Sequence, residues 1–294
     1  MTSTMFHKIS LIGVGLMGGS LGMALRKCHL ADYVYGIGRN PQRLQDAVDV
    51  GAIDIATTSF EEGLKDADIV VLCVPVLTTL SLVKQILPFV SPPTVLTDVG
   101  STKLGVVKII NKQLFELSSK VEFIGSHPMC GSEKSGVDAA THCLYQGATC
   151  VLTPTAETSS QSLEKLKKMW EAVGCHTIEM SPEDHDRSVA MYSHLPHIVS
   201  SVLVNAIESL DEKWANPNNL ASSGFKDTTR IAASHPQIWS DICIENRENL
   251  LEAVTQMEST LAQFHNLIEK SDSHGMYEFF NKARDVRNSK INNK

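Results

Sequence analysis

A glycine motif near the start of the chain constrains the fold more than any other feature. Gly13, Gly15 and Gly18 follow an apolar run at residues 9–12 and open an amphipathic segment that continues to residue 28. In a strand–turn–helix unit that binds a dinucleotide, the first glycine makes the tight turn, the second lets the backbone approach the pyrophosphate, and the third lets helix and strand pack closely. The motif therefore predicts a dinucleotide-binding domain, with the N–H groups of the helix N-terminus facing the phosphates.

Apolar runs and amphipathic segments alternate through the first 180 residues. We expect strands at 9–12, 33–37, 69–74, 95–97, 123–124 and 149–152, and helices at 21–28, 41–50, 80–87 and 104–117. Several of the runs are almost continuous in Val, Ile and Leu, which is typical of parallel strands covered on both faces. The alternation predicts an α/β fold with a Rossmann-type, doubly wound and mostly parallel sheet.

The character of the sequence changes after residue 180. Ser181 and Pro182, followed by two acidic residues, form a strong helix start. Beyond it we expect no strand, and apolar periodicity at 185–210 and 238–268 predicts long helices, the first kinked or interrupted by Pro196. The chain therefore divides into an expected dinucleotide-binding domain at 1–180 and an all-helical substrate and dimerisation domain at 181–294.

Charge and cysteine content narrow the classes of partner and compartment. The net charge of −7 argues against a nucleic-acid backbone or an anionic membrane as partner. Seven scattered cysteines without a Cys-x-x-Cys pair suit free thiols in a reducing compartment. The start lacks the layout of a signal peptide, and no apolar run approaches the roughly 20 residues that span a bilayer. We expect a cytoplasmic protein that acts on a small molecule.

The end of the second expected strand bears on the choice of cofactor. Gly38 stands about 20 residues beyond the glycine motif, where an NAD site usually carries Asp or Glu, and Arg39 follows it. Without that carboxylate a 2′-phosphate is not repelled, and a guanidinium can bind it. The hypothesis is a preference for NADP, with NAD also accepted. In the alternative interpretation, Arg39 stacks on the adenine or lies in solvent.

Four more residues complete the expected cofactor site. Leu16 and Met17 lie inside the glycine motif, and Val74 and Pro75 lie at the end of the expected strand at 69–74. Open α/β sheets bind their ligands at the carboxyl ends of the strands, which is where these residues fall.

Four polar segments resemble, in their order, the prephenate and arogenate dehydrogenases of tyrosine biosynthesis. They are Asp-Val-Gly-Ser-Thr-Lys at 98–103, Gly-Ser-His-Pro-Met at 125–129, Ser-His-Leu-Pro-His at 193–197 and Asp-Thr-Thr-Arg-Ile-Ala at 227–232. With the glycine motif, the resemblance runs from residue 13 to about residue 241. It implies oxidative decarboxylation of prephenate, or also of arogenate, with hydride transfer to NAD(P). The products would be 4-hydroxyphenylpyruvate or tyrosine, and CO2. It also implies a homodimer.

The resemblance assigns catalytic roles to two residues that follow neighbouring strands. His127 is the candidate base, because an unperturbed imidazole titrates near pH 6.5. Ser101 matches the family residue that hydrogen-bonds the catalytic histidine and the substrate hydroxyl. In the alternative interpretations, His127 is a buried residue that caps a turn, and Ser101 caps the helix that begins at Lys103.

Four further residues are expected to bind the substrate. Arg230 suits a substrate carboxylate through its planar fork, and Glu133 is placed by the resemblance at the mouth of the site, where it can pair with Arg230. His197 matches a residue that lines the pocket and favours prephenate, because imidazole suits a keto acid better than a second ammonium. His194 lines the same pocket or packs within the helix. Because no Cys or acid close in sequence completes a ligand set with these histidines, we expect no metal.

Two other functions stay open at this point. Another NADP-dependent dehydrogenase, of the β-hydroxyacid type, shares the two-domain plan but relies on a catalytic lysine in the second domain, and residues 182–210 offer no persuasive counterpart. A nucleotide-sensing module would bind the cofactor without turnover. The joint presence of His127, Ser101 and Arg230 argues against it.

Overall fold

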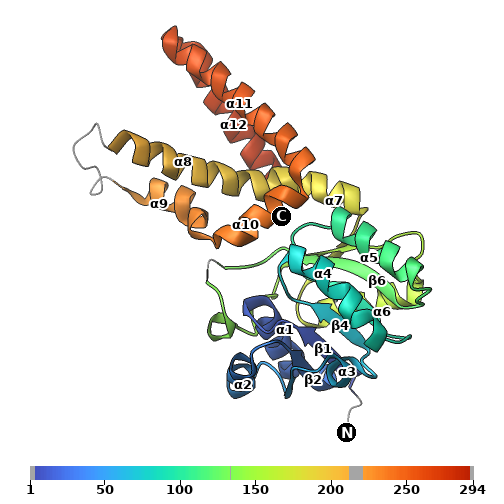
Figure 1. The fold of residues 1–294 in the computed structure, drawn as a ribbon. Coiled ribbons are helices and arrows are strands. Elements are labelled where there is room, and N and C mark those ends of the chain that lie inside the picture. The colour runs from blue at the N-terminus through green and yellow to red at the C-terminus, as the bar shows by residue number, and fades with distance from the viewer. Residues whose placement is uncertain (1–3, 133, 212–220, 292–294) are drawn as a thin grey trace. The chain divides into compact units, whose positions relative to one another are not determined.

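The computed structural model describes residues 4–132, 134–211 and 221–291 (Figure 1). Its contacts divide the chain into two compact units, residues 1–246 and residues 247–294. The first unit contains a sheet of eight strands and most of the helices. Within the described ranges, no helix is both long and apolar enough to cross a membrane.

The sheet has the order β3-β2-β1-β4-β5-β6-β7-β8. Every neighbouring pair is parallel except β6 and β7, which confirms the doubly wound, mostly parallel α/β prediction. The strands are β1 (Phe6–Ile12), β2 (Ala31–Ile37), β3 (Ile55–Thr57), β4 (Ile69–Leu72), β5 (Val95–Asp98), β6 (Glu122–Pro128), β7 (Thr149–Thr153) and β8 (His176–Glu179). The two edge strands, β3 and β8, were not expected, because one has three residues and the other is largely exposed.

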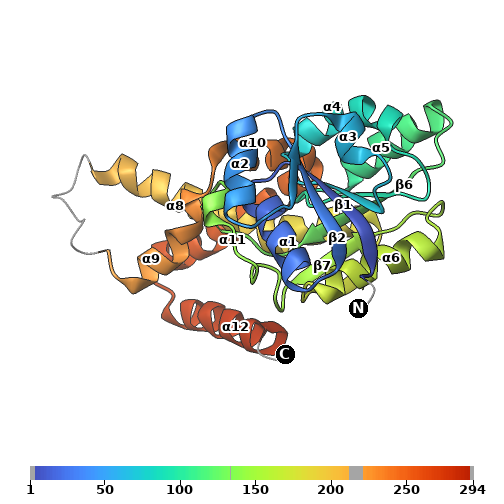
Figure 2. The ribbon, with the colours of Figure 1, turned by 90° about the horizontal axis from the view of Figure 1, so that it is seen from below.

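Two hydrophobic cores cover the two faces of this sheet. One face packs against α1 (Leu16–Lys27), α2 (Pro41–Asp49) and α6 (Ser160–Ala172), and the other against α3 (Phe60–Leu64), α4 (Val76–Ile86) and α5 (Leu104–Glu116). Figure 2 shows α4 and α5 on one side of the sheet and α1 and α6 on the other. The direction of winding reverses between β1 and β4, and such a switch point opens a crevice at the carboxyl ends of the strands.

The helical part of the first unit starts where the sequence predicted it. Ser181 caps α7 (Pro182–Val189), its hydroxyl accepting from the Asp184 N–H at 3.0 Å. A π-helical turn at Ala190–His194 separates α7 from α8 (Leu195–Asp211), which confirms the interruption expected at Pro196. Proline has no N–H to continue the ladder, and its ring crowds the carbonyl one turn back, so the turn before it widens. Then follow α9 (Ser223–Thr229), a 3-10 turn (Arg230–Ala233) and α10 (Pro236–Glu245).

The expected single helix at 238–268 is wrong, because α10 ends at Glu245 and α11 (Arg247–Glu269) begins after Asn246. Asn246 is buried, and its side-chain amide donates to the Asp186 carbonyl at 2.8 Å. A polar side chain used in this tertiary contact ends α10. In the second unit, α11 and α12 (Ser273–Ile291) pack together, with the rings of Phe264 and Phe279 4.9 Å apart.

Candidate active site

The glycine loop between β1 and α1 has the shape that a pyrophosphate requires. Gly13 has a positive φ of 92°, and a Cβ added there would lie 2.7 Å from the Cys73 carbonyl oxygen. A Cβ at Gly18 would lie 2.1 Å from the Gly13 oxygen, so helix and loop touch. A Cβ at Gly15, in contrast, would meet no protein atom within 4 Å. Packing does not require glycine at position 15, so the loop leaves a cradle that fits a dinucleotide.

The other expected cofactor residues surround this loop. Val74 and Pro75 follow β4, and a Cβ at Gly13 would come within 2.8 Å of a Val74 methyl group. Leu16 and Met17 form the first turn of α1, and the Met17 carbonyl accepts from the buried Tyr145 hydroxyl at 2.8 Å. No side chain caps this end of α1. Its N–H groups therefore remain for phosphate oxygens.

Arg39 follows Gly38 at the end of β2 and is exposed. The next residue, Asn40, caps α2 by accepting from the N–H groups of Gln42 and Arg43 at 2.9 and 3.2 Å. No ion pair or hydrogen bond holds the Arg39 side chain among the residues that the structure describes. It is therefore available to a ligand at the carboxyl edge of the sheet.

His127 lies at the carboxyl end of β6 and is only 7% exposed. Its Nδ1 makes a 2.8 Å hydrogen bond with Nε2 of His185. His185 is one of the buried residues of α7. Burial, followed by the neighbouring His185 and the Lys103 ammonium, holds the pKa of His127 well below its usual value. The ring is therefore neutral at physiological pH and able to act as a base.

A hydrogen-bond chain continues from His127 into the helical segment. Nδ1 of His185 lies 2.7 Å from Oδ1 of Asp186, and both side chains are buried. The Asp186 carboxylate also accepts from the N–H groups of Lys103 and Leu104 at 2.7 and 2.9 Å, at the start of α5. Asp186 therefore caps α5. The alternative in which Ser101 caps this helix is wrong, since no side chain of the loop itself does so.

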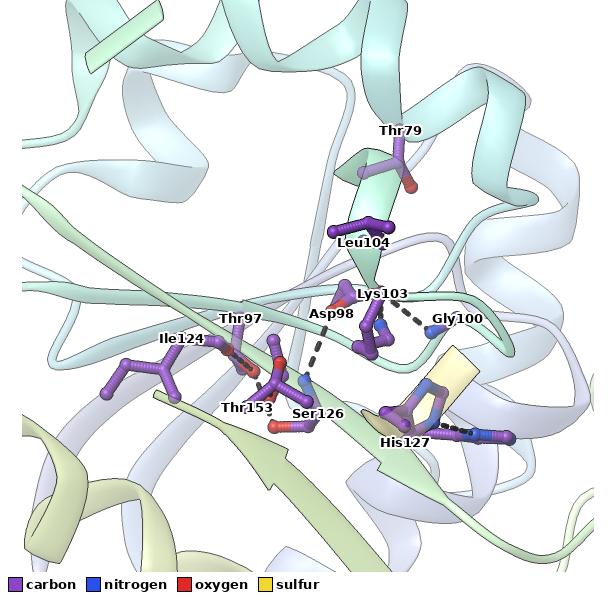
Figure 3. A network of polar contacts seen from close by, with 12 residues as sticks. Thr79, Thr97, Asp98, Gly100, Lys103, Leu104, Ile124, Ser126, His127 and Thr153 are labelled. Atoms are coloured by element: carbon purple, nitrogen blue, oxygen red, sulfur yellow. Dashed lines mark hydrogen bonds and ion pairs between the residues drawn. The ribbon is translucent and has the colours of Figure 1, made fainter. Parts of the chain in front are cut away.

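A buried ion pair between Asp98 and Lys103 joins the two ends of the 98–103 loop, and Asp98 also bonds to β6. Asp98 accepts from the N–H groups of Gly100 at 2.9 Å and of Ser126 at 3.2 Å. Figure 3 shows this network beside His127. The 98–103 loop is thus fixed to the strand that carries the candidate base.

Ser101 lies in this loop and is half-buried. The Ser101 backbone interacts with the His194 ring and raises its pKa, against the larger effect of burial. The loop therefore lies next to the π-helical turn that contains His194. The structure records no hydrogen bond between Ser101 and His127. Glu133 lies outside the described residues.

His194 and His197 are brought together by Trp239 of α10. The His197 ring stacks on Trp239 at 3.7 Å, and the His194 ring meets its edge at 6.0 Å. Burial lowers the pKa of His194 to about 4. Burial and the charge of Arg230 lower the pKa of His197, and a hydrogen bond with the Ile231 backbone partly offsets this by raising it. Arg230, exposed at the end of α9, therefore lies close to His197. Nε2 of His194 and Nδ1 of His197 have no hydrogen-bond partner in the described part of the chain.

Sequence reasoning missed Trp239, His185 and Asp186 as members of this site. The helix start at Ser181 contains a usable signal for the last two, since the inward positions of α7 are occupied by Pro182, His185, Asp186 and Val189. Two polar residues at buried positions of a helix mark a functional or hydrogen-bonded site. Trp239 has no such signal in its spacing. Across the described ranges, no group of three His, Cys, Asp or Glu side chains is arranged to hold a metal ion.

A dinucleotide cradle and a buried neutral imidazole at the same edge of a doubly wound sheet define a nicotinamide-dependent oxidoreductase. The profile described as the prephenate dehydrogenase nucleotide-binding domain matches residues 21–179, and that of the prephenate dehydrogenase dimerization domain matches residues 181–282. The chain belongs to the prephenate dehydrogenase family.

Individual relatives agree with this family over nearly the whole chain. Prephenate dehydrogenase of Bacillus subtilis is 35% identical over 95% of this chain and 75% of its own length. The structure of Aquifex aeolicus prephenate dehydrogenase with hydroxyphenyl propionate and NAD+ is similar at a TM-score of 0.89, with 35% identity and coverage of 98% and 99%. Synechocystis arogenate dehydrogenase has a TM-score of 0.81, with 30% identity and coverage of 97% and 100%.

Proposed function

We propose that this protein oxidatively decarboxylates prephenate to 4-hydroxyphenylpyruvate and CO2. The observation that carries the proposal is the position of His127, a buried neutral imidazole bonded at Nδ1 and located at the sheet edge that also holds the glycine cradle. Bound nicotinamide supplies the hydride acceptor. His127 takes the proton of the ring hydroxyl, and the ring carboxylate leaves as CO2 while the ring becomes aromatic. Aromatisation supplies the driving force.

The remaining residues bind and orient the substrate. Ser101 hydrogen-bonds the ring hydroxyl at the end of the fixed 98–103 loop. Arg230 binds a carboxylate through its planar fork. His197 and His194 line the pocket from α8 and the π-helical turn, and their unpartnered nitrogens, Nδ1 and Nε2, are suited to hydrogen-bond a polar ligand.

Prephenate is proposed as the preferred acid and arogenate as the weaker one. His197 lies close to the Arg230 cation. A pocket with these groups suits the keto group of prephenate better than the additional ammonium group of arogenate. The family relatives include enzymes named for each acid, which is why both are tested.

NADP is proposed as the preferred cofactor. Arg39 is exposed beyond β2, and no carboxylate occupies the position before it, where one would repel a 2′-phosphate. A charge-assisted hydrogen bond contributes about 1.5–3 kcal/mol, so Arg39→Ala should lower kcat/KM for NADP roughly 10- to 100-fold. The value for NAD should stay nearly constant. Equal losses with both cofactors would contradict the assignment.

A homodimer built on the helical domain, which we place at residues 181–294, is proposed from the dimerization-domain match. Large apolar side chains are exposed on its helices, including Val202, Ile238, Ile244, Leu251, Leu261 and Ile268. Burial of such side chains against a second copy of the chain would remove apolar surface from water and stabilise a dimer. Light scattering after gel filtration should give twice the mass of the chain, and the mass of one chain would contradict the dimer.

The decisive experiment follows the absorbance of reduced nicotinamide with prephenate and arogenate, each against NAD and NADP. Fastest reduction with prephenate and NADP is expected. Reduction with either acid supports the family reaction and ranks the four pairs. A folded protein that binds NADP but reduces it with neither acid would overturn the proposed function.

A further inference from the structure

A general base of the histidine type works through one particular ring nitrogen. A neutral imidazole carries its hydrogen on either Nδ1 or Nε2, and only the other nitrogen can accept a proton. His127 is bonded at Nδ1, and Nε2 has no hydrogen-bond partner among the described residues. Its competence as a base therefore depends on which nitrogen carries the hydrogen.

The hydrogen-bond chain behind His127 can be followed from its far end. The Asp186 carboxylate is an acceptor only, and it already accepts from the backbone N–H groups of Lys103 and Leu104. The 2.7 Å contact with Oδ1 of Asp186 therefore requires a hydrogen on Nδ1 of His185. The backbone donors at the start of α5 fix the carboxylate in place, so this direction is built into the fold.

The position of the hydrogen on the His185 ring determines which nitrogen of His127 carries its hydrogen. Burial keeps His185 neutral by lowering its pKa, although the Asp186 hydrogen bond opposes this effect. A neutral ring with its hydrogen on Nδ1 presents a lone pair at Nε2. The 2.8 Å contact must then be a hydrogen bond donated by Nδ1 of His127 to Nε2 of His185. Nε2 of His127 is left without hydrogen.

We propose that His185 and Asp186 are positioning residues that hold His127 in the Nδ1–H tautomer, with Nε2 free to accept the substrate proton. The assignment rests on the proposed role of His127 as base. When the hydroxyl proton arrives at Nε2, the Nδ1 hydrogen bond to His185 is retained, and no other proton needs to move. The Asp186 carboxylate, one ring further on, then stabilises the imidazolium electrostatically.

Other charged and titratable groups around the chain do not replace this connection. The nearby Lys103 ammonium lowers the pKa of both His127 and His185. Asp98, which is paired with Lys103, raises the pKa of His185 and so opposes that effect. His194 adds to the effect at His127, and Glu245 lies close to Asp186 from α10. Only His185 bonds directly to the His127 ring among the described residues.

The direct test is nitrogen NMR of the full-length protein with labelled histidine. The chemical shifts and couplings of the ring nitrogens identify the tautomer of each histidine, and His127→Asn assigns the His127 signals. We expect the Nδ1–H form in the wild type at neutral pH. The Nε2–H form would overturn the proposal. This measurement requires no turnover, so inactivity on prephenate would overturn the proposed function without affecting this result.

Two variants with matched size give the kinetic test. His185→Gln keeps an acceptor for Nδ1 of His127 in its amide oxygen, whereas His185→Leu removes it. The leucine variant should lose at least about 100-fold in kcat, within the range of general-base catalysis, and its His127 should shift towards the Nε2–H form. Its KM and its Kd for NADP should change little. The glutamine variant should stay within about tenfold of wild-type kcat. Equal activity of the leucine variant and the wild type would overturn the proposal.

Discussion

At the His127 ring, burial increases the fraction of unprotonated base but weakens the affinity of that base for a proton. It lowers the pKa, so the ring is unprotonated over a wide range of pH, and it removes solvent that would compete with the substrate. A base with a lowered pKa has a smaller driving force for accepting a proton. The hydrogen bonds to His185 and Asp186 offset this loss by stabilising the imidazolium as it forms.

The substitution His127→Asn tests the base itself. The asparagine amide can still donate to His185, so the surrounding network and the cofactor site should remain intact. We expect kcat to fall about 10²- to 10⁴-fold, because no proton acceptor remains near the substrate hydroxyl. NADP titration by fluorescence should give a nearly unchanged Kd. Turnover within threefold of the wild type would show that another group acts as base.

Arg230 should act on binding rather than on the chemical step. Removing a charge-assisted bond to a carboxylate costs about 1.5–3 kcal/mol, so Arg230→Ala should raise the KM for prephenate roughly 10- to 100-fold. The kcat should change little. Arg230→Lys keeps the charge but not the planar fork, so its KM for prephenate should lie between those of the wild type and Arg230→Ala. A drop in kcat with constant KM would assign Arg230 a role in the transition state instead.

Sequence alone could predict individual residues of the site where a local signal exists. His127 stands at the end of a recognisable strand, and the sheet edge at which strands end is the general binding edge of such folds. Its connection to His185 could not be predicted, because 58 positions separate the two and the contact depends on how α7 packs on the sheet. The stacking of Trp239 on His197 depends in the same way on the packing of α10.

At the scale of elements, the strand–loop–helix unit at β1 and α1 separates the glycines that packing needs from the one that the ligand needs. A Cβ at Gly18 would collide with backbone at 2.1 Å, whereas a Cβ at Gly15 would meet nothing within 4 Å. Gly15 also has a negative φ of −96°, which other residues can adopt.

Two alanine variants test this separation. Gly15→Ala should destabilise the protein by no more than about 1 kcal/mol, the difference between glycine and alanine at a helix N-cap, and weaken dinucleotide binding at least about tenfold. Gly18→Ala should destabilise the protein by about 2 kcal/mol or more. Urea unfolding and cofactor titration measure both effects. Full cofactor affinity in Gly15→Ala would place the pyrophosphate elsewhere.

Elements were predictable where their own residues decide them. The central strand β4 is apolar throughout, and Ser181 and Pro182 start α7 by local capping. The edge strand β8 is paired to β7, but its exposed pattern gives no strand signal. The break at Asn246 was missed because the apolar periodicity continues across it, while the cause is a tertiary hydrogen bond to Asp186.

At the scale of the whole molecule, three buried histidines link folding to pH. The pKa values of His127, His185 and His194 are all lowered by burial, that of His194 to about 4. The unfolded chain, in which histidine titrates near 6.5, therefore binds more protons than the folded chain between these values. Stability contributed by the neutral rings is fully present above pH 6.5 and is lost as the pH falls towards the folded-state pKa values.

We expect the free energy of unfolding to decrease as the pH is lowered from 7 to 4.5, with His194 contributing up to about 3 kcal/mol over its full window. Urea unfolding at half-unit steps of pH measures the slope. His194→Asn is the matched control, because its amide oxygen can still accept from Asn246 but does not titrate in this range. Its slope between pH 6.5 and 4.5 should be shallower than that of the wild type. Identical slopes would show that His194 does not couple folding to pH, and would restrict the effect to His127 and His185.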